Sequence, residues 1–117
     1  MMLMAPVGDD ANGMFLKRHC QQLGIETQCM VTIKGATTSS YVSIVDEAEE
    51  MQVAIADMSL IDDFGEAELD KFLPQLQAAR LVVLDANLAP VCLAFLMKKL
   101  PQQNFLWILC QLLKPHE

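Results

Sequence analysis

The sequence has few of the residues that form catalytic or metal sites on their own. Its 117 residues include only two histidines, one tryptophan and one tyrosine. The four cysteines (Cys20, Cys29, Cys92 and Cys110) show neither C-x-x-C spacing nor a histidine at a metal-ligand interval, so we expect no metal site. Reduced thiols are the ordinary state in the cytosol, and a cytoplasmic location is therefore expected.

Basic residues and long apolar runs are also scarce. Eight Lys and Arg residues against fifteen Asp and Glu residues give a net charge of −7, whereas nucleic acid and anionic membranes both require a basic face. Lys98, Lys99 and Pro101 interrupt the longest apolar stretches, which leaves no membrane span. The apolar start, residues 1–7, is too short for a secretory signal. We expect neither nucleic acid nor membrane as a partner.

What is present is a patterned apolar chain. Hydrophobic residues make up 53% of the sequence, which is enough to build a core. Residues 29–57 alternate with period two, which predicts a set of antiparallel strands. The other periodic segments predict a strand over 2–7, a helix over 12–23, a helix over 66–79, a buried strand over 81–84 and a helix over 90–100. The fold class is therefore α/β, a parallel sheet with an antiparallel excursion.

Polar residues near predicted strand ends are candidate ligand-binding groups. Asp85 and Asn87 follow the 81–84 strand, at the edge where open α/β sheets bind ligands, although both residues equally suit a turn or a helix cap. Residues 37–41 carry five hydroxyls; because strand faces alternate, about half of them could line one polar pocket, and otherwise the segment is an exposed ribbon. Asp57 is either a ligand group or a loop acid. No phosphate-binding glycine loop and no catalytic Ser-His-Asp or Cys-His set is found.

Four segments, in order, resemble motifs of the PfkB (ribokinase-like) carbohydrate kinase family. Residues 7–13 (VGDDANG), before a helix and Gly24-Ile25, resemble the family's VGxDxxG segment. Residues 34–46 (KGATTSSYVSIVD) resemble its P-G-x-x-T-x-x-Y ribbon. Within the family, residues 50–58 (EMQVAIADM) and 81–88 (LVVLDANL) look like the pseudouridine kinase branch. The match runs from about residue 5 to residue 100.

The resemblance implies a partial kinase domain over residues 1–104. Its fold would be a fragment of a ribokinase-like, Rossmann-type parallel sheet, with lid-type strands over about 29–57. The activity implied is transfer of the ATP γ-phosphoryl group to a sugar or nucleoside hydroxyl, with pseudouridine as the favoured substrate and ribose or a purine nucleoside as alternatives. The substrate-binding candidates implied are Thr38, Ser40, Tyr41, Asp57 and Asn87.

Several motifs of the family have no counterpart in these 117 residues. They are an upstream sugar-binding Asp with a Gly-Gly pair, and the downstream N-x-x-E and D-T-x-G-A-G-D motifs, which supply the magnesium-phosphate network, the catalytic base and an anion hole. We therefore expect a fragment truncated at both ends that has no catalytic residues and is inactive alone. ATP and Mg²⁺ would serve the full-length family, with no cofactor for this chain. The alternative is a non-catalytic interaction module that self-associates through exposed sheet edges.

Residues 105–117 depart from the family pattern. One permitted coding from Leu106 onward, read from its third base, encodes Val-Asp-Pro-Val-Ser-Ala-Ala-Lys-Ala, which is similar to the family's strand at this place. One interpretation is a change of reading frame near Phe105, after which the chain packs poorly and leaves the parallel sheet. The other is a native amphipathic terminal helix or strand.

Overall fold

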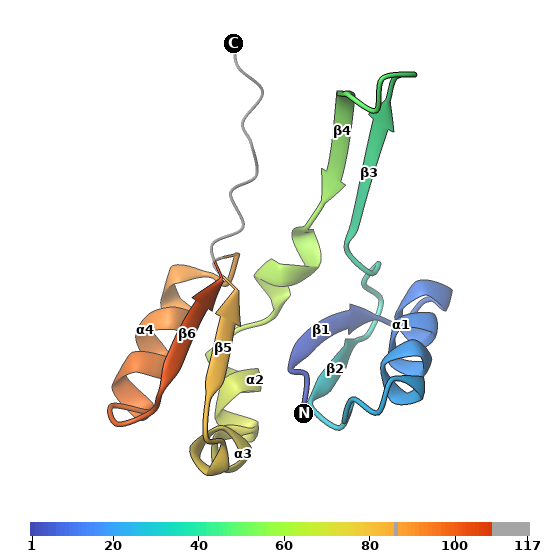
Figure 1. The fold of residues 1–117 in the computed structure, drawn as a ribbon. Helices are drawn as coiled ribbons and strands as arrows, with labels where there is room; N and C mark the ends of the chain where they lie inside the picture. Colours follow the sequence, from blue (N-terminus) through green and yellow to red (C-terminus); the bar gives the residue numbers. More distant parts are fainter. Residues whose placement is uncertain (86, 109–117) are drawn as a thin grey trace. The chain divides into compact units, whose positions relative to one another are not determined.

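The computed structural model describes residues 1–85 and 87–108 (Figure 1). The chain divides into two compact units, Met1–Phe64 and Gly65–Glu117, and each is described by itself. Among the described residues the strands form three two-stranded sheets. The first and last of these are parallel and the middle one is antiparallel, which agrees with the predicted α/β class.

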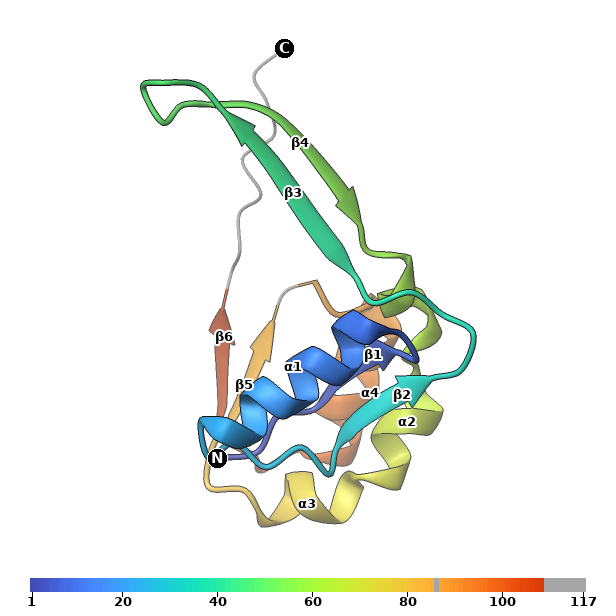
Figure 2. The ribbon, with the colours of Figure 1, turned by 90° about the vertical axis from the view of Figure 1, so that its right-hand side faces the viewer.

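The first unit begins with a strand–helix–strand motif, made of β1 (Ala5–Gly8), α1 (Ala11–Gln22) and β2 (Met30–Ile33). The two strands pair in parallel, with Ala5 opposite Met30 and Gly8 opposite Ile33, and α1 contacts β1 (Figure 2). The helix ends at Gln22, and Gly24 just after its C-cap has a φ of 73°, the left-handed conformation that glycine adopts without strain. The sequence predicted this helix to within one residue at each end.

The pairing of β2 corrects one prediction. Period-two alternation placed all of residues 29–57 in antiparallel strands, yet Met30–Ile33 pairs in parallel with β1. Alternation reports only that successive side chains point to opposite faces. It does not distinguish the two strand directions, whereas a helix between two strands, as here, is the connection that parallel pairing requires.

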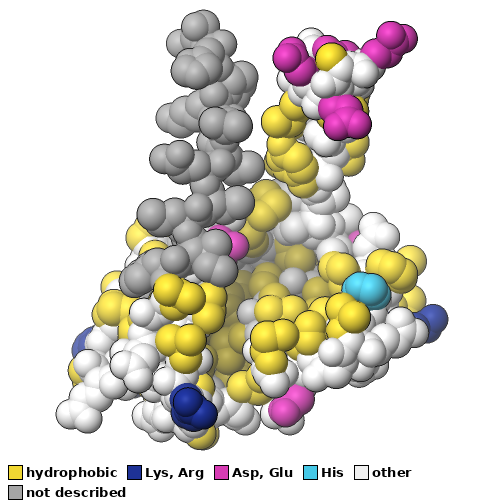
Figure 3. Space-filling view, viewed as in Figure 1, with side chains coloured by type: hydrophobic (Ala, Val, Ile, Leu, Met, Phe, Trp, Pro, Cys, Tyr) yellow, Lys and Arg dark blue, Asp and Glu magenta, His cyan; other side chains and the backbone are white. Residues whose placement is uncertain are grey.

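The antiparallel part is a ribbon of β3 (Ser40–Val45) and β4 (Met51–Asp57). Every side chain of both strands is exposed, and the ribbon is long and narrow in both ribbon views (Figures 1 and 2). Apolar side chains follow its length and acidic ones gather at its tip (Figure 3). At that tip Asp46 accepts hydrogen bonds from the backbone N–H groups of Ala48 and Glu50, at 2.9 and 3.0 Å. A short 3₁₀ helix, η1 (Ser59–Asp63), follows β4.

The second unit contains the remaining elements: α2 (Glu66–Lys71), α3 (Leu73–Ala78), β5 (Val82–Asp85), α4 (Pro90–Lys99) and β6 (Phe105–Ile108). The sequence predicted one helix over 66–79, but the structure has two, separated at Phe72. Pro74 explains the break, because a proline within a helix lacks the N–H for the i−4 hydrogen bond and its ring clashes with that carbonyl. Pro90 stands at the first position of α4, where a missing N–H costs nothing.

The expectation that the chain leaves the parallel sheet near Phe105 is wrong for the first four residues of the tail. β6 pairs in parallel with β5, with Val82 opposite Phe105 and Asp85 opposite Ile108. Residues 109–117 lie outside the described residues. The proposed change of reading frame stays a prediction, which the nucleotide sequence of codons 106–115 tests.

No helix within residues 1–85 and 87–108 combines the length and the apolar character that crossing a membrane requires.

Candidate functional site

The root of the ribbon is tied to the β1–α1 turn by one carboxylate. Asp10 is the N-cap of α1, and its Oδ1 accepts from the backbone N–H of Gly13 at 2.8 Å. The same Oδ1 accepts from the hydroxyl of Thr38 at 2.6 Å, and Oδ2 accepts from the backbone N–H of Thr38 at 2.9 Å. The Thr38 hydroxyl in turn accepts from the N–H of Gly8 at 3.0 Å. The β1–α1 turn and the segment before β3, which lie 28 residues apart at Asp10 and Thr38, therefore meet at Asp10.

These contacts depend on two glycines that have no room for a side chain. A Cβ on Gly8 would meet the backbone of Ala36 and Thr38, and a Cβ on Gly13 would meet the carbonyl oxygen of Gly8. Both glycines are buried. The turn and the segment before β3 thus approach each other at a distance that only glycine allows.

Thr38, a predicted substrate-binding residue, is buried within this network. Only 4% of its surface is exposed, and its hydroxyl both donates to Asp10 and accepts from Gly8. A threonine hydroxyl can donate one hydrogen bond, and Thr38 donates it to Asp10. In the structure, Thr38 holds the start of the ribbon, and its donor is not available to a ligand.

Ser40 and Asp57, two further predicted residues, are brought together as cross-strand partners at the base of the ribbon. Directly opposite residues in an antiparallel pair have Cβ atoms about 4.5–5.5 Å apart and share one face. Both side chains are exposed. Oδ1 of Asp57 accepts from the hydroxyl and the N–H of Ser59, at 2.7 and 3.2 Å. Those bonds, the hydroxyl first, lower the pKa of the Asp57 carboxyl, so the group is ionised at neutral pH.

Tyr41 and Asn87 are not part of this pair. Tyr41 follows Ser40 directly and so points to the opposite face of the ribbon, where its hydroxyl lies 3.3 Å from Sδ of Met51. Asn87 belongs to the second unit, where its backbone N–H donates to Oδ1 of Asp85 at 2.7 Å. Asp85 and Asn87 thus form the Asx-type turn that the sequence left open as one of two interpretations.

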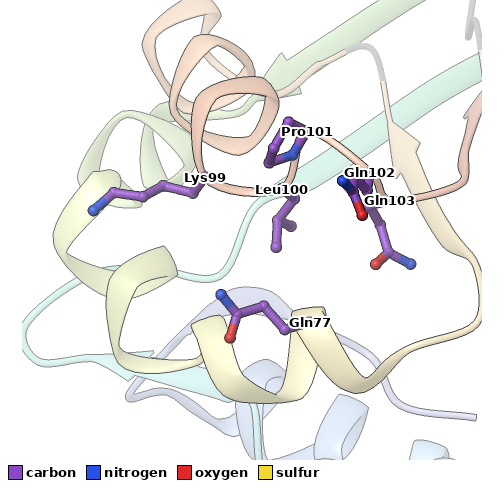
Figure 4. A pocket seen from close by; sticks show the side chains of 6 residues that line it. All are labelled: Gln77, Lys99, Leu100, Pro101, Gln102 and Gln103. Atoms are coloured by element: carbon purple, nitrogen blue, oxygen red, sulfur yellow. The ribbon is translucent and has the colours of Figure 1, made fainter.

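A shallow depression in the second unit holds none of the predicted residues. It measures about 360 Å³ and is lined by Gln77, Lys99, Leu100, Pro101, Gln102 and Gln103 (Figure 4). Its single charged group, Lys99, stands at the C-terminal end of α4, with its ammonium 5.5 Å from the centre of the Phe95 ring. The amide of Gln103 is already used, because Nε2 donates to the carbonyl of Ala79 at 2.7 Å. This surface offers little chemistry for recognising a ligand.

A metal site would need several His, Cys, Asp or Glu side chains close together. Within residues 1–85 and 87–108, no three His, Cys, Asp or Glu side chains gather closely enough to hold a metal ion. This part of the chain therefore does not fit a magnesium site by itself.

Asp10, Gly8 and Gly13 were not among the predicted site residues, although all three stand at fixed positions of the VGxDxxG segment that residues 7–13 resemble. A second signal was local: an aspartate directly before a predicted helix is an N-cap pattern. That pattern identifies the bond from Gly13 to Asp10. It says nothing of Thr38, which lies 28 residues further along the chain, so the second half of the network was visible only in three dimensions.

The chain is similar in sequence and in fold to known sugar and nucleoside kinases. The chain is 32% identical over 95 residues to pseudouridine kinase of Escherichia coli (strain K12), an alignment that covers 81% of this chain and 30% of that enzyme. A Clostridium perfringens structure provisionally assigned as a sugar kinase superposes with a TM-score of 0.80 at 28% identity, over 93% of this chain and 34% of the other. Ribokinase from Giardia lamblia, at 22% identity, shares the fold with a TM-score of 0.77, over 91% of this chain and 36% of the other.

The chain thus spans about a third of the length of these relatives. Residues 1–107 match the family described as pfkB family carbohydrate kinase. That match covers far more than half of the sequence. The chain belongs to the PfkB family of carbohydrate kinases.

Proposed function

We propose that this chain supplies part of the substrate-binding side of a cytoplasmic kinase that transfers the ATP γ-phosphoryl group to a hydroxyl of a sugar or nucleoside. Pseudouridine is the favoured substrate, and ribose or a purine nucleoside is the alternative. Family membership supports the reaction class, and the 32% identity to pseudouridine kinase supports the substrate.

The pairing of Ser40 with Asp57 is the observation that carries the proposal. An ionised carboxylate accepts hydrogen bonds only, and sugar hydroxyls donate them. Oδ2 of Asp57 accepts no hydrogen bond from the described part of the chain, since Ser59 uses Oδ1 alone. Ser40 beside it adds a hydroxyl that both donates and accepts. Two adjacent sugar hydroxyls would find both partners on one face of the ribbon.

Equilibrium dialysis of the purified chain against labelled pseudouridine tests this proposal. We expect saturable binding that Asp57→Asn weakens roughly tenfold, the factor for losing a hydrogen bond to a charged group. Asp46→Asn is the matched control, because it removes the same charge from the same ribbon at its tip. Equal losses in both variants, or no saturable binding by the unmodified chain, would argue against the site. Uridine, ribose and adenosine as competitors rank the substrates.

We also expect no phosphoryl transfer by the 117-residue chain alone. Phosphoryl transfer depends on positioning and electrostatic stabilisation of the phosphates. The sequence contains no glycine-rich phosphate loop, and the described residues gather no metal-binding cluster. The measurement is transfer of labelled γ-phosphate from ATP to pseudouridine with Mg²⁺ present. Product above the level of a reaction without protein would show this expectation to be wrong.

A second candidate function is self-association through the ribbon. The outer edges of β3 and β4 have no partner strand within the described residues, and free edges favour pairing with another chain. Val42 and Ile55, opposite each other, are 56% and 65% exposed. Sedimentation equilibrium distinguishes the candidates: an interaction module would dimerise and Val42→Lys would reduce the dimer, whereas a monomer at all concentrations would exclude the module.

A further inference from the structure

The Asp10 carboxylate does more than cap a helix. Capping α1 requires one acceptor oxygen, and Ser, Thr, Asn and Asp all provide it. Asp10 uses Oδ1 for that bond to Gly13 and commits Oδ2 to the backbone N–H of Thr38. Only a carboxylate offers acceptors at both positions. The choice of aspartate over the other capping residues is therefore explained by Thr38 and not by the helix.

We propose that Asp10 and Thr38 are positioning residues that fix where the β3–β4 ribbon leaves the first unit, and thereby hold the Ser40–Asp57 pair in place. Thr38 stands two residues before β3, so the chain between it and Ser40 extends about 7 Å at most. A segment this short leaves Ser40 little freedom once Thr38 is held by Asp10 and Gly8.

The ribbon has little else within its own strands to fix it. All thirteen residues of β3 and β4 are exposed, so no buried side chain of the ribbon anchors it to a core. At the β3 end of its base, the contacts are the three hydrogen bonds of Thr38, which is itself buried. Gly8 and Gly13 permit those bonds by their lack of side chains. The β3 end of the ribbon is thus fixed at Thr38, whereas the β4 end continues into η1, which contacts β1 and buries Leu60.

The negative charge of Asp10 strengthens its hydrogen bonds to Thr38. The Thr38 hydroxyl, then the Thr38 N–H, then the Gly13 N–H hold the pKa of Asp10 below its ordinary value. Hydrogen bonds to an ionised acceptor are shorter and stronger than those between neutral groups. The 2.6 Å bond from the Thr38 hydroxyl has the length expected of such a bond.

Amide hydrogen exchange on the full 117-residue chain, followed by nuclear magnetic resonance, tests the proposal without any nucleoside. Asp10→Asn keeps an oxygen for Gly13 and places an amide donor against the Thr38 N–H. We expect exchange at Thr38 to quicken roughly tenfold, the factor for one charge-assisted hydrogen bond, with shifted signals at Ser40 and Asp57 and unchanged protection along α1. Asp9→Asn is the matched control, since it removes the same charge from the adjacent residue, whose Oδ2 accepts from Gly35 at 2.9 Å.

The Thr38 variants provide a second, spectroscopic readout. Thr38→Val keeps the shape of the side chain and removes the hydroxyl, so the pKa of Asp10, followed by the carbon signal of its carboxyl group, should rise toward the ordinary value. The same variant removes the acceptor of the Gly8 N–H, which should then exchange faster. Thr38→Ser should restore both the lowered pKa of Asp10 and the slower exchange at Gly8. The proposal is overturned if Asp10→Asn loosens α1 and leaves Thr38 unchanged, or if serine fails to restore what valine removes. It depends on the proposed function only in naming the Ser40–Asp57 pair, so a failure of nucleoside binding leaves this result standing.

Discussion

Gly13→Ala is expected to destabilise the first unit by about 1–3 kcal/mol, the usual cost of forcing atoms into a packed site. The result is informative because a loss of stability is the opposite of what this substitution usually gives in a helix. A glycine replaced by alanine in an unhindered helix ordinarily gains about 0.5–1 kcal/mol. Here the new Cβ would meet the carbonyl oxygen of Gly8 and lie 3.0 Å from Oγ1 of Thr38. The backbone of β1 would have to move, and with it the base of the ribbon.

Asn12→Ala is the control for that substitution. Asn12 lies in the same first turn of α1 and is exposed, so alanine should leave the stability unchanged or raise it slightly. Urea unfolding followed by circular dichroism measures both variants. A gain in stability for Gly13→Ala comparable to that of Asn12→Ala would mean that the close approach of Gly13 and Gly8 does not exist in solution.

Leu96→Ala is expected to destabilise the second unit by about 2–5 kcal/mol, the range for truncating a buried leucine. Leu96 is 1% exposed and lies on α4, which contacts α2. Alanine would remove apolar contact and leave a cavity that the helices fill only in part. Val91→Ala on the same helix is the control, because Val91 is 53% exposed and its truncation removes little buried surface.

Hydrogen exchange measured residue by residue shows which elements lose stability in Leu96→Ala. It should appear in α2 and α4 and be small in β1 and β2, since the two units are separately compact. Equal effects of the two substitutions would contradict the burial of Leu96.

The helices and strands of this chain were largely predictable because each carries a local signal. α1 is followed by Gly24 in the left-handed conformation, α4 begins at a proline, and β5 is an apolar run closed by Asp85. What the pattern did not contain was the partner of each strand. β2 and β6 pair in parallel with β1 and β5, and such pairing depends on contacts distant in sequence. The break between α2 and α3 had a local signal, Pro74, which the helical periodicity around it outweighed.

The candidate site was predictable in its residue types and not in their roles. Ser40 and Asp57 became a pair only through the register of the ribbon. Thr38 was grouped with them by the family resemblance, whereas in the structure it is buried and bonded to Asp10. Alternation separates Tyr41 from Ser40 without any structure, although the resemblance grouped both as substrate-binding candidates.

Titration of the ¹⁵N-labelled chain with pseudouridine, followed by amide chemical shifts, tests the proposed substrate-binding face most directly. Free uracil is the control ligand, since it keeps a pyrimidine base and lacks the sugar hydroxyls that Asp57 would bind. We predict saturable shifts at the amides of Ser40 and Asp57 with pseudouridine, none with uracil, and none at Gln77 or Lys99 in the second unit. Shifts confined to the second unit, or no saturable shift at Ser40 and Asp57, would contradict the proposal.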